Sequence, residues 1–171
     1  GDLFFINVPK LESLVAYQRI IRLFGCLHLI EITQIVDFGG LDSLELIGED
    51  IRIINNDAIV DLSQLGNLVT INGSLIIRDN DNLRNLEGLR NLESIRDTLM
   101  ITNNLALSEC CGINDFLRNG GVTGAIVISD NLVGCLDVED INQNCTDEDG
   151  DGYVLKDDCD DMKVGLNCDG E

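Results

Sequence analysis

Residues 51–74 read IRIINNDAIVDLSQLGNLVTINGS, and residues 75–98 read LIIRDNDNLRNLEGLRNLESIRDT. The two stretches align position by position, and the same 24-residue spacing holds for four successive periods. One apolar column consists of Leu3, Leu27, Ile51, Leu75 and Leu99, and a second of Phe5, Leu29, Ile53, Ile77 and Ile101. A unit this short cannot bury its own apolar face. We therefore expect the units to stack as the coils of an all-β solenoid around one continuous core.

Each 24-residue coil contains a short apolar triplet followed by a polar corner. Side chains alternate along a strand, so the first and third residues of the triplet point inward and the middle one outward. Three residues after successive triplets stand Asn56, Asn80 and Asn104. An inward asparagine at a tight corner would bond the backbone of the neighbouring coil, and stacked asparagines would repeat that bond. The alternative is that these asparagines are exposed turn residues.

The 24-residue register is interrupted once, after Leu107. Ile128 lies 27 residues after Ile101, which indicates an insertion of three residues. The interrupted segment has apolar residues at helical spacing and then two glycines, namely Ile113, Phe116, Leu117, Gly120 and Gly121. This pattern predicts a short helix over the last coil, then one more strand and a cap. A cap is needed because a naked final coil would expose apolar core and an unpaired strand edge.

Charge divides the chain into two parts. The net charge is −20 in total, with −9 over residues 1–136 and −11 over residues 137–171. Such an acidic protein would repel nucleic acid, so we expect no nucleic-acid partner. No segment approaches the ~18 consecutive apolar residues of a membrane span. We predict a repeat domain over residues 1–145 and an acidic tail over residues 146–171.

Six of the seven cysteines lie after residue 109, which is typical of a disulfide-stapled end in an oxidising compartment. A zinc site is the weaker alternative, because the chain has no CxxC pair and only one histidine, His28. Cys110 and Cys111 are adjacent and cannot readily bond each other. Each therefore pairs with Cys135 or Cys145, and the sequence does not choose between the two arrangements. Cys26 stands alone in the second coil, and we expect it to be a free, inert thiol.

Residues 86–95, LEGLRNLESI, followed by a strand and by NNL at 103–105, resemble the receptor L-domain and related leucine-rich repeats. The ending, with Cys110-Cys111, a helix and DNLVGC at 130–135, is similar to the cap of bacterial members. The resemblance implies a right-handed single-stranded β-helix that presents one flat parallel sheet. It also implies a secreted or cell-surface protein, of bacterial origin. Repeat frames of this kind serve many partners, so the resemblance indicates fold more strongly than function.

The acidic tail contains a calcium-loop pattern, DEDGDGYVLKDD at residues 147–158. Carboxylates stand at positions 1, 3, 5 and 12 of this loop with glycine at position 6, which is the spacing of an EF-hand loop. Together with acidic residues just beyond the loop, the predicted ligands for Ca²⁺ are Asp147, Asp149, Asp151, Tyr153, Asp158, Asp160 and Asp161. The alternative is a solvated acidic linker.

No helix is expected on either side of this loop, and a cysteine follows it. The arrangement resembles the thrombospondin type-3 motif, in which calcium loops alternate with cysteines along a stalk. The resemblance implies that Cys159 and Cys168 close a second loop by a disulfide, and that the tail begins a longer stalk. The complete fold prediction is an all-β solenoid with short capping helices and a loop-rich calcium-binding tail.

The outward strand positions decide between two classes of function. A polysaccharide lyase or hydrolase built on a β-helix, or its carbohydrate-binding part, needs acidic or basic clusters there, and these columns hold no carboxylate. They are instead rich in apolar residues, here called the apolar stripe: Phe4, Ile6, Ile30, Ile54, Ile76, Met100 and Val127. We therefore predict a non-catalytic recognition, adhesion or fibre-building module. Its partner, a protein, a glycan or a second copy, would dock on this stripe.

Overall fold

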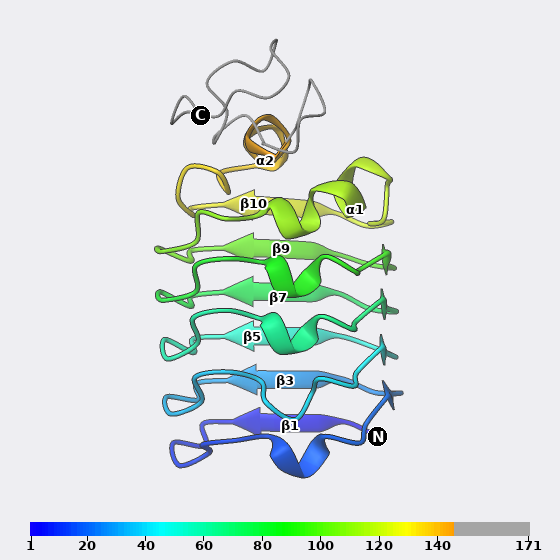
Figure 1. Cartoon of the computed structure of the whole chain (residues 1–171), viewed down its shortest axis with the longest axis vertical. Helices are drawn as coiled ribbons and strands as arrows, with labels where there is room; N and C mark the ends of the chain where they lie inside the picture. Colours follow the sequence, from blue (N-terminus) through cyan, green and yellow to red (C-terminus); the bar gives the residue numbers. More distant parts are fainter. Residues whose placement is uncertain (146–171) are drawn as a thin grey trace, which may run out of the picture.

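The computed structural model describes residues 1–145 as a stack of parallel strands (Figure 1). The principal sheet has six strands in the order β1-β3-β5-β7-β9-β10. Their bounds are β1 Leu3–Ile6, β3 Leu27–Ile30, β5 Ile51–Ile54, β7 Leu75–Arg78, β9 Leu99–Thr102 and β10 Ile126–Ser129. Leu3 pairs with Leu27 and Leu27 with Ile51, so neighbouring strands are one 24-residue repeat apart. The last pair, Ile128 with Ile101, is 27 residues apart, which confirms the predicted insertion of three.

A second parallel sheet runs beside the first, in the order β2-β4-β6-β8. Its strands are β2 Arg22–Leu23, β4 Leu46–Ile47, β6 Thr70–Ile71 and β8 Ser94–Ile95. The sequence predicts a single sheet, so this second sheet was not expected. Each of these strands is two residues long, too short to show the alternation that marks a strand. The available signal was a further buried column at the same spacing, formed by Leu23, Ile47, Ile71 and Ile95.

Single turns of 3-10 helix occupy equivalent places in the repeats, in front of the six-stranded sheet in Figure 1. They are η1 Val15–Tyr17, η2 Ser63–Leu65, η3 Glu87–Leu89 and η4 Cys111–Ile113. Gly88 and Gly112 let consecutive turns approach closely, because a Cβ on either would overlap a carbonyl of the preceding repeat. The core therefore lies between these turns and the two sheets, with Leu62, Leu86 and Ile113 fully buried.

The predicted asparagines form a buried ladder at the corner after each strand. Asn56, Asn80 and Asn104 are all 0% exposed, which excludes the alternative of exposed turn residues. The Asn80 side-chain amide donates to the carbonyl of Ile53 at 3.0 Å, and Asn56 and Asn104 donate in the same way to Leu29 and Ile77. Asn131 continues the ladder past the insertion by donating to Ile101 at 3.0 Å. Each asparagine thus satisfies backbone groups that would otherwise be buried without partners.

The carboxyl-terminal cap follows the sequence prediction. Helix α1, Asn114–Arg118, lies in the inserted segment, β10 follows it, and α2, Val138–Asn144, covers the final repeat. Asp137 caps α2 by accepting from the backbone N–H of Asp140 at 2.8 Å. Disulfides join Cys110 to Cys135 and Cys111 to Cys145. The predicted cap disulfides are thereby confirmed. Of the two arrangements that the sequence left open, the structure contains this one.

Within residues 1–145 no helix is long and apolar enough to cross a membrane.

Candidate ligand-binding face

The outward side chains of the six-stranded sheet form the candidate site. Burial alternates along β1, β3, β5, β7 and β9, as in β5, where Ile51 and Ile53 are fully buried and Ile54 is half-buried. In β10 the alternation is incomplete, because Ile126 and Val127 are both exposed. Phe4 and Ile6, on the edge strand β1, are each 52% exposed, whereas the inner members of the apolar stripe shield one another. The alternation predicted from the sequence therefore places the whole stripe on one face.

The strand register brings the seven stripe residues together. Ile6 pairs with Ile30 and Ile30 with Ile54, which joins β1, β3 and β5. In the column two residues earlier on each strand, Ile76 pairs with Met100 and Met100 with Val127. Ile54 and Ile76 lie on neighbouring strands as diagonal partners, within reach of each other across a sheet. The stripe is therefore continuous, with one step from column to column between β5 and β7.

Two arginines occupy the outward positions of β5 and β7 that do not belong to the apolar stripe. Arg52 is paired in register with Ile76, and Ile54 with Arg78. Arg52 forms an ion pair with Asp50 at 3.1 Å, and Arg78 forms one with Asp79 at 3.5 Å. Exposed pairs of this kind contribute only about 0–1 kcal/mol to stability. Their effect here is to place guanidinium groups, each balanced by a carboxylate, beside an apolar surface.

These ion pairs were not predicted from the sequence. The available signal was a carboxylate close by in sequence, Asp50 two residues before Arg52 and Asp79 directly after Arg78.

His28 adds a ring to the face next to Phe4. The two rings are 4.6 Å apart between centroids, at an interplanar angle of 38°. Nε2 of His28 is buried without a hydrogen-bond partner in the described part of the chain. Burial lowers the pKa of His28, and the neighbouring Arg52 lowers it further, against smaller opposing effects of Asp50 and Asp2. The imidazole is thus held in its neutral form and extends the apolar surface.

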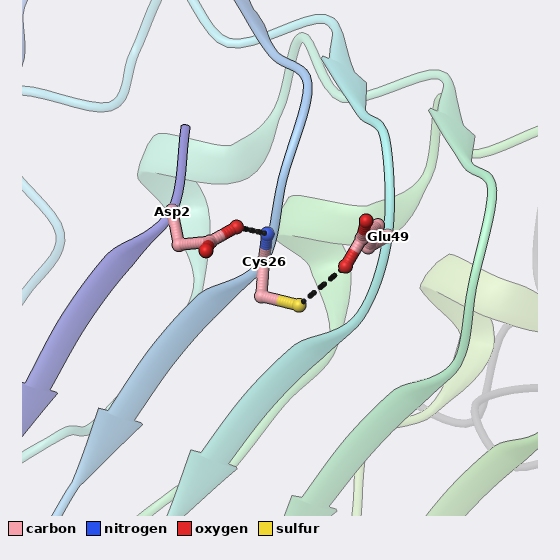
Figure 2. Close-up of side chains that lie close together, drawn as sticks. All are labelled: Asp2, Cys26 and Glu49. Atoms are coloured by element: carbon pink, nitrogen blue, oxygen red, sulfur yellow. Dashed lines mark hydrogen bonds between the residues drawn. The ribbon is translucent and has the colours of Figure 1, made fainter.

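Cys26 lies just before β3, between two carboxylates (Figure 2). Its thiol donates to Oε2 of Glu49 at 3.2 Å, and its backbone N–H donates to Oδ1 of Asp2 at 3.0 Å. Asp50 accepts from the backbone N–H of Ser74 in the same way, so Asp2 performs a structural task that recurs in the repeat. Cys26 is a free cysteine, as the sequence predicted.

The trio of Asp2, Cys26 and Glu49 is the one group among residues 1–145 whose ligand atoms lie close enough to hold a metal, within 4.8 Å of one another. Burial is the main cause that raises the pKa of the Cys26 thiol, and Glu49 raises it further, whereas a backbone hydrogen bond at Asp50 acts in the opposite direction. Only a thiolate is a good metal ligand or nucleophile. The arrangement therefore favours a protonated thiol that serves as a hydrogen-bond donor.

The predicted calcium ligands and the two tail cysteines lie outside the described residues. These positions are Asp147, Asp149, Asp151, Tyr153, Asp158, Asp160, Asp161, Cys159 and Cys168.

The similarity of this chain to known proteins is found at the level of the family. A family model described as Receptor L domain matches residues 45–146, which run from just before β4 to the end of the cap. No curated protein and no solved structure matches the chain.

Proposed function

Because the chain belongs to the receptor L domain family, we propose that it is a non-catalytic recognition or adhesion module, or a building block of a surface fibre. A protein, a glycan or a second copy of the chain docks on the apolar stripe. The observation that carries this proposal is the continuity of seven outward apolar side chains across six strands. A contiguous apolar surface of this extent is typical of an interaction site on a soluble domain.

The proposed location is the outside of a cell, as a secreted or surface-attached protein of a bacterium. Two disulfides in the cap support an oxidising compartment, since disulfides persist there and are rare in the cytosol. Membership of the receptor L domain family supports the same location.

The absence of catalysis is part of the proposal, and the titratable groups on and beside the face support it. The outward columns contain no carboxylate within β1 to β10. His28 has a lowered pKa and is stacked on Phe4, and the Cys26 thiol has a raised pKa. Covalent catalysis requires an activated nucleophile beside a general base. The Cys26 thiol does contact the Glu49 carboxylate at 3.2 Å, but its raised pKa favours the protonated, unreactive form. The competing proposal, a β-helix enzyme acting on polysaccharide, has no such support.

The path of the chain is proposed to be a right-handed single-stranded β-helix, that is, a solenoid with 24-residue coils. The constant register of the six-stranded sheet and the asparagine ladder support this description.

Calcium binding by the tail is the remaining element of the proposal. Its support is the carboxylate spacing at Asp147, Asp149, Asp151 and Asp158, with Gly152 at the turn. Calcium would order and stiffen this segment, because closely spaced carboxylates repel one another without a cation. Isothermal titration with CaCl₂ should show binding that Asp149→Ala combined with Asp151→Ala abolishes. If the unmodified chain shows no heat and no calcium-dependent protection from protease, the tail is an acidic linker.

The role of the face is tested by placing charge on the stripe. Ile54→Lys combined with Ile76→Lys should leave the circular dichroism spectrum unchanged and should weaken both self-association and glycan binding. Sedimentation velocity and an oligosaccharide array are the two measurements. Val36→Lys combined with Val60→Lys is the matched control, because both valines are exposed and lie outside the six-stranded sheet. Equal behaviour of the two double variants in both assays would show that the stripe binds nothing.

A further inference from the structure

A cleft of about 690 Å³ lies away from the apolar stripe, where the turns after η2 and η3 meet helix α1. Its size is within the ~300–1,000 Å³ of pockets that hold small ligands. Val69 and Leu92 contribute apolar side chains, and Phe116 of α1 forms part of one end. Because α1 exists only in the repeat with the three-residue insertion, the break in register is what gives this cleft its end wall.

Two asparagines of the cleft present hydrogen-bond acceptors. The Nδ2 of Asn67 donates to the carbonyl of Asp42 at 2.6 Å, and the Nδ2 of Asn91 donates to the carbonyl of Gly66 at 2.7 Å. Neither Oδ1 accepts a hydrogen bond within residues 1–145, and both asparagines are exposed. The amide orientation is thus fixed by the repeat, and the acceptor atoms are available to a ligand.

Two carboxylates, those of Glu45 and Glu93, stand on the repeats before and after that of Val69. The backbone N–H of Val69 donates to the backbone carbonyl of Glu45 at 2.9 Å, and the backbone N–H of Glu93 donates to the carbonyl of Val69 at 2.9 Å. The three residues therefore form successive rungs. Asp115, in the first turn of α1, adds a third carboxylate. Arg90 also lines the cleft, but its guanidinium is paired with Glu87. The cleft is therefore rich in acceptors and negatively charged, which disfavours an anionic ligand.

The spacing of these acceptors distinguishes between two ligands that donate hydrogen bonds. Adjacent rungs of a parallel sheet, such as those of Asn67 and Asn91, are ~4.8 Å apart. This is close to the distance between consecutive rings of an extended β-linked glycan. An extended peptide instead repeats every ~3.3 Å, or about 6.7 Å for side chains on one side, and does not match the rungs. Sugar rings also offer C–H faces that fit the partly exposed side chain of Val69.

We propose that this cleft binds a short, neutral, β-linked oligosaccharide. Sugar hydroxyls donate to Oδ1 of Asn67 and Asn91 and to the carboxylates of Glu45 and Glu93, and one ring packs on Val69. This site is separate from the apolar stripe, so it stands or falls independently of the function proposed for that face.

The test uses the full chain and arrays of neutral cello-, manno- and chito-oligosaccharides, with titration calorimetry on any that bind. Glu45→Ala combined with Glu93→Ala should weaken binding by about tenfold or more, as expected for lost hydrogen bonds to charged groups. Glu12→Ala combined with Glu109→Ala changes the charge equally at exposed positions outside the cleft, and should not weaken binding. Val69→Trp should abolish binding by filling the cleft, with the fold checked by circular dichroism.

Salt separates a neutral sugar from a basic peptide. Binding of the oligosaccharide should be nearly constant from about 0.05 to about 0.5 M NaCl, since no ligand charge is screened. The proposal is overturned if no neutral oligosaccharide binds, or if the control variant loses binding as strongly as the cleft variant. It is also overturned if the cleft variant loses binding only to an oligolysine probe, in a salt-dependent way.

Discussion

The Oδ1 atom of Asn80 accepts a hydrogen bond at 3.0 Å from the backbone N–H of Asn56, one repeat earlier in the chain. Asn104 does the same for the backbone N–H of Asn80 at 3.1 Å. The amide group of Asn80 also donates to Ile53 in the preceding repeat, whereas its backbone N–H donates to the following one, so the residue links three repeats. The ladder fixes the register between coils at the corner, where the sheet no longer does so.

Asn80→Ala should destabilise the domain by about 3 kcal/mol, because it leaves the N–H of Asn56 and the carbonyl of Ile53 buried without partners. Urea denaturation followed by circular dichroism measures the change. Asn82→Ala is the control, since Asn82 is exposed and makes one surface hydrogen bond, to Asp57. Its cost should be about 0.5 kcal/mol or less. Equal destabilisation by the two changes would contradict the role of the ladder.

Glu31→Asn should stabilise the domain by up to about 1 kcal/mol. Glu31 has φ of 56°, the left-handed conformation, which is costly for most side chains and better tolerated by asparagine. The equivalent residues of other repeats are Asn55, Asp79 and Asn103, which shows what this corner accommodates. The midpoint of thermal unfolding should rise for Glu31→Asn and stay constant for Glu12→Asn, a change at a residue whose φ is not positive. A lower midpoint for Glu31→Asn would refute this explanation.

Acid should destabilise the domain through His28. Its pKa is lowered in the folded chain, so in the pH range just below the unfolded value of ~6.5 the unfolded chain binds more protons. Stability is therefore fully present above that value and is lost as the pH falls toward the folded pKa. The free energy of unfolding from urea titrations should decrease between about pH 7.5 and about pH 5.5. His28→Gln should flatten the decrease, and an unchanged slope would show that another group is responsible.

Mild alkylation of the denatured, unreduced protein should modify Cys26 and leave the four cap cysteines unlabelled. Peptide mapping by mass spectrometry identifies the modified residue. Replacing Cys110 and Cys135 together by alanine should lower the free energy of unfolding by about 2–4 kcal/mol, because the disulfide restricts the unfolded chain. Labelled cap cysteines in the unreduced protein would contradict both the pairing and the extracellular location.

Much of the fold could be predicted because the repeat makes local sequence and global structure agree. Leu27, Ile51 and Leu75 recur at one spacing, so each predicts the strand that contains it and the neighbours with which it pairs. The inserted helix, the strand at β10 and the inward asparagines followed from the same columns. The second sheet did not, since its two-residue strands carry no periodic signal of their own.

The two candidate sites also differ in whether the sequence predicts them. The seven residues of the apolar stripe were identified from alternation alone, because side-chain direction along a strand is fixed by the backbone. The cleft beside α1 was not identified. It depends on how far a helix from one repeat reaches over Asn91 and Val69 of two earlier ones, and that is a property of packing.

The sequence by itself determined the 24-residue repeat, the inward and outward faces, the cap and its four cysteines, since all of these depend on spacing along one chain. Only the tertiary structure decided that Cys110 pairs with Cys135 and Cys111 with Cys145, and that Cys26 donates to Glu49. These relationships join atoms from different repeats. The distances between these atoms depend on how the repeats are packed against one another, and the spacing along the chain does not specify that packing.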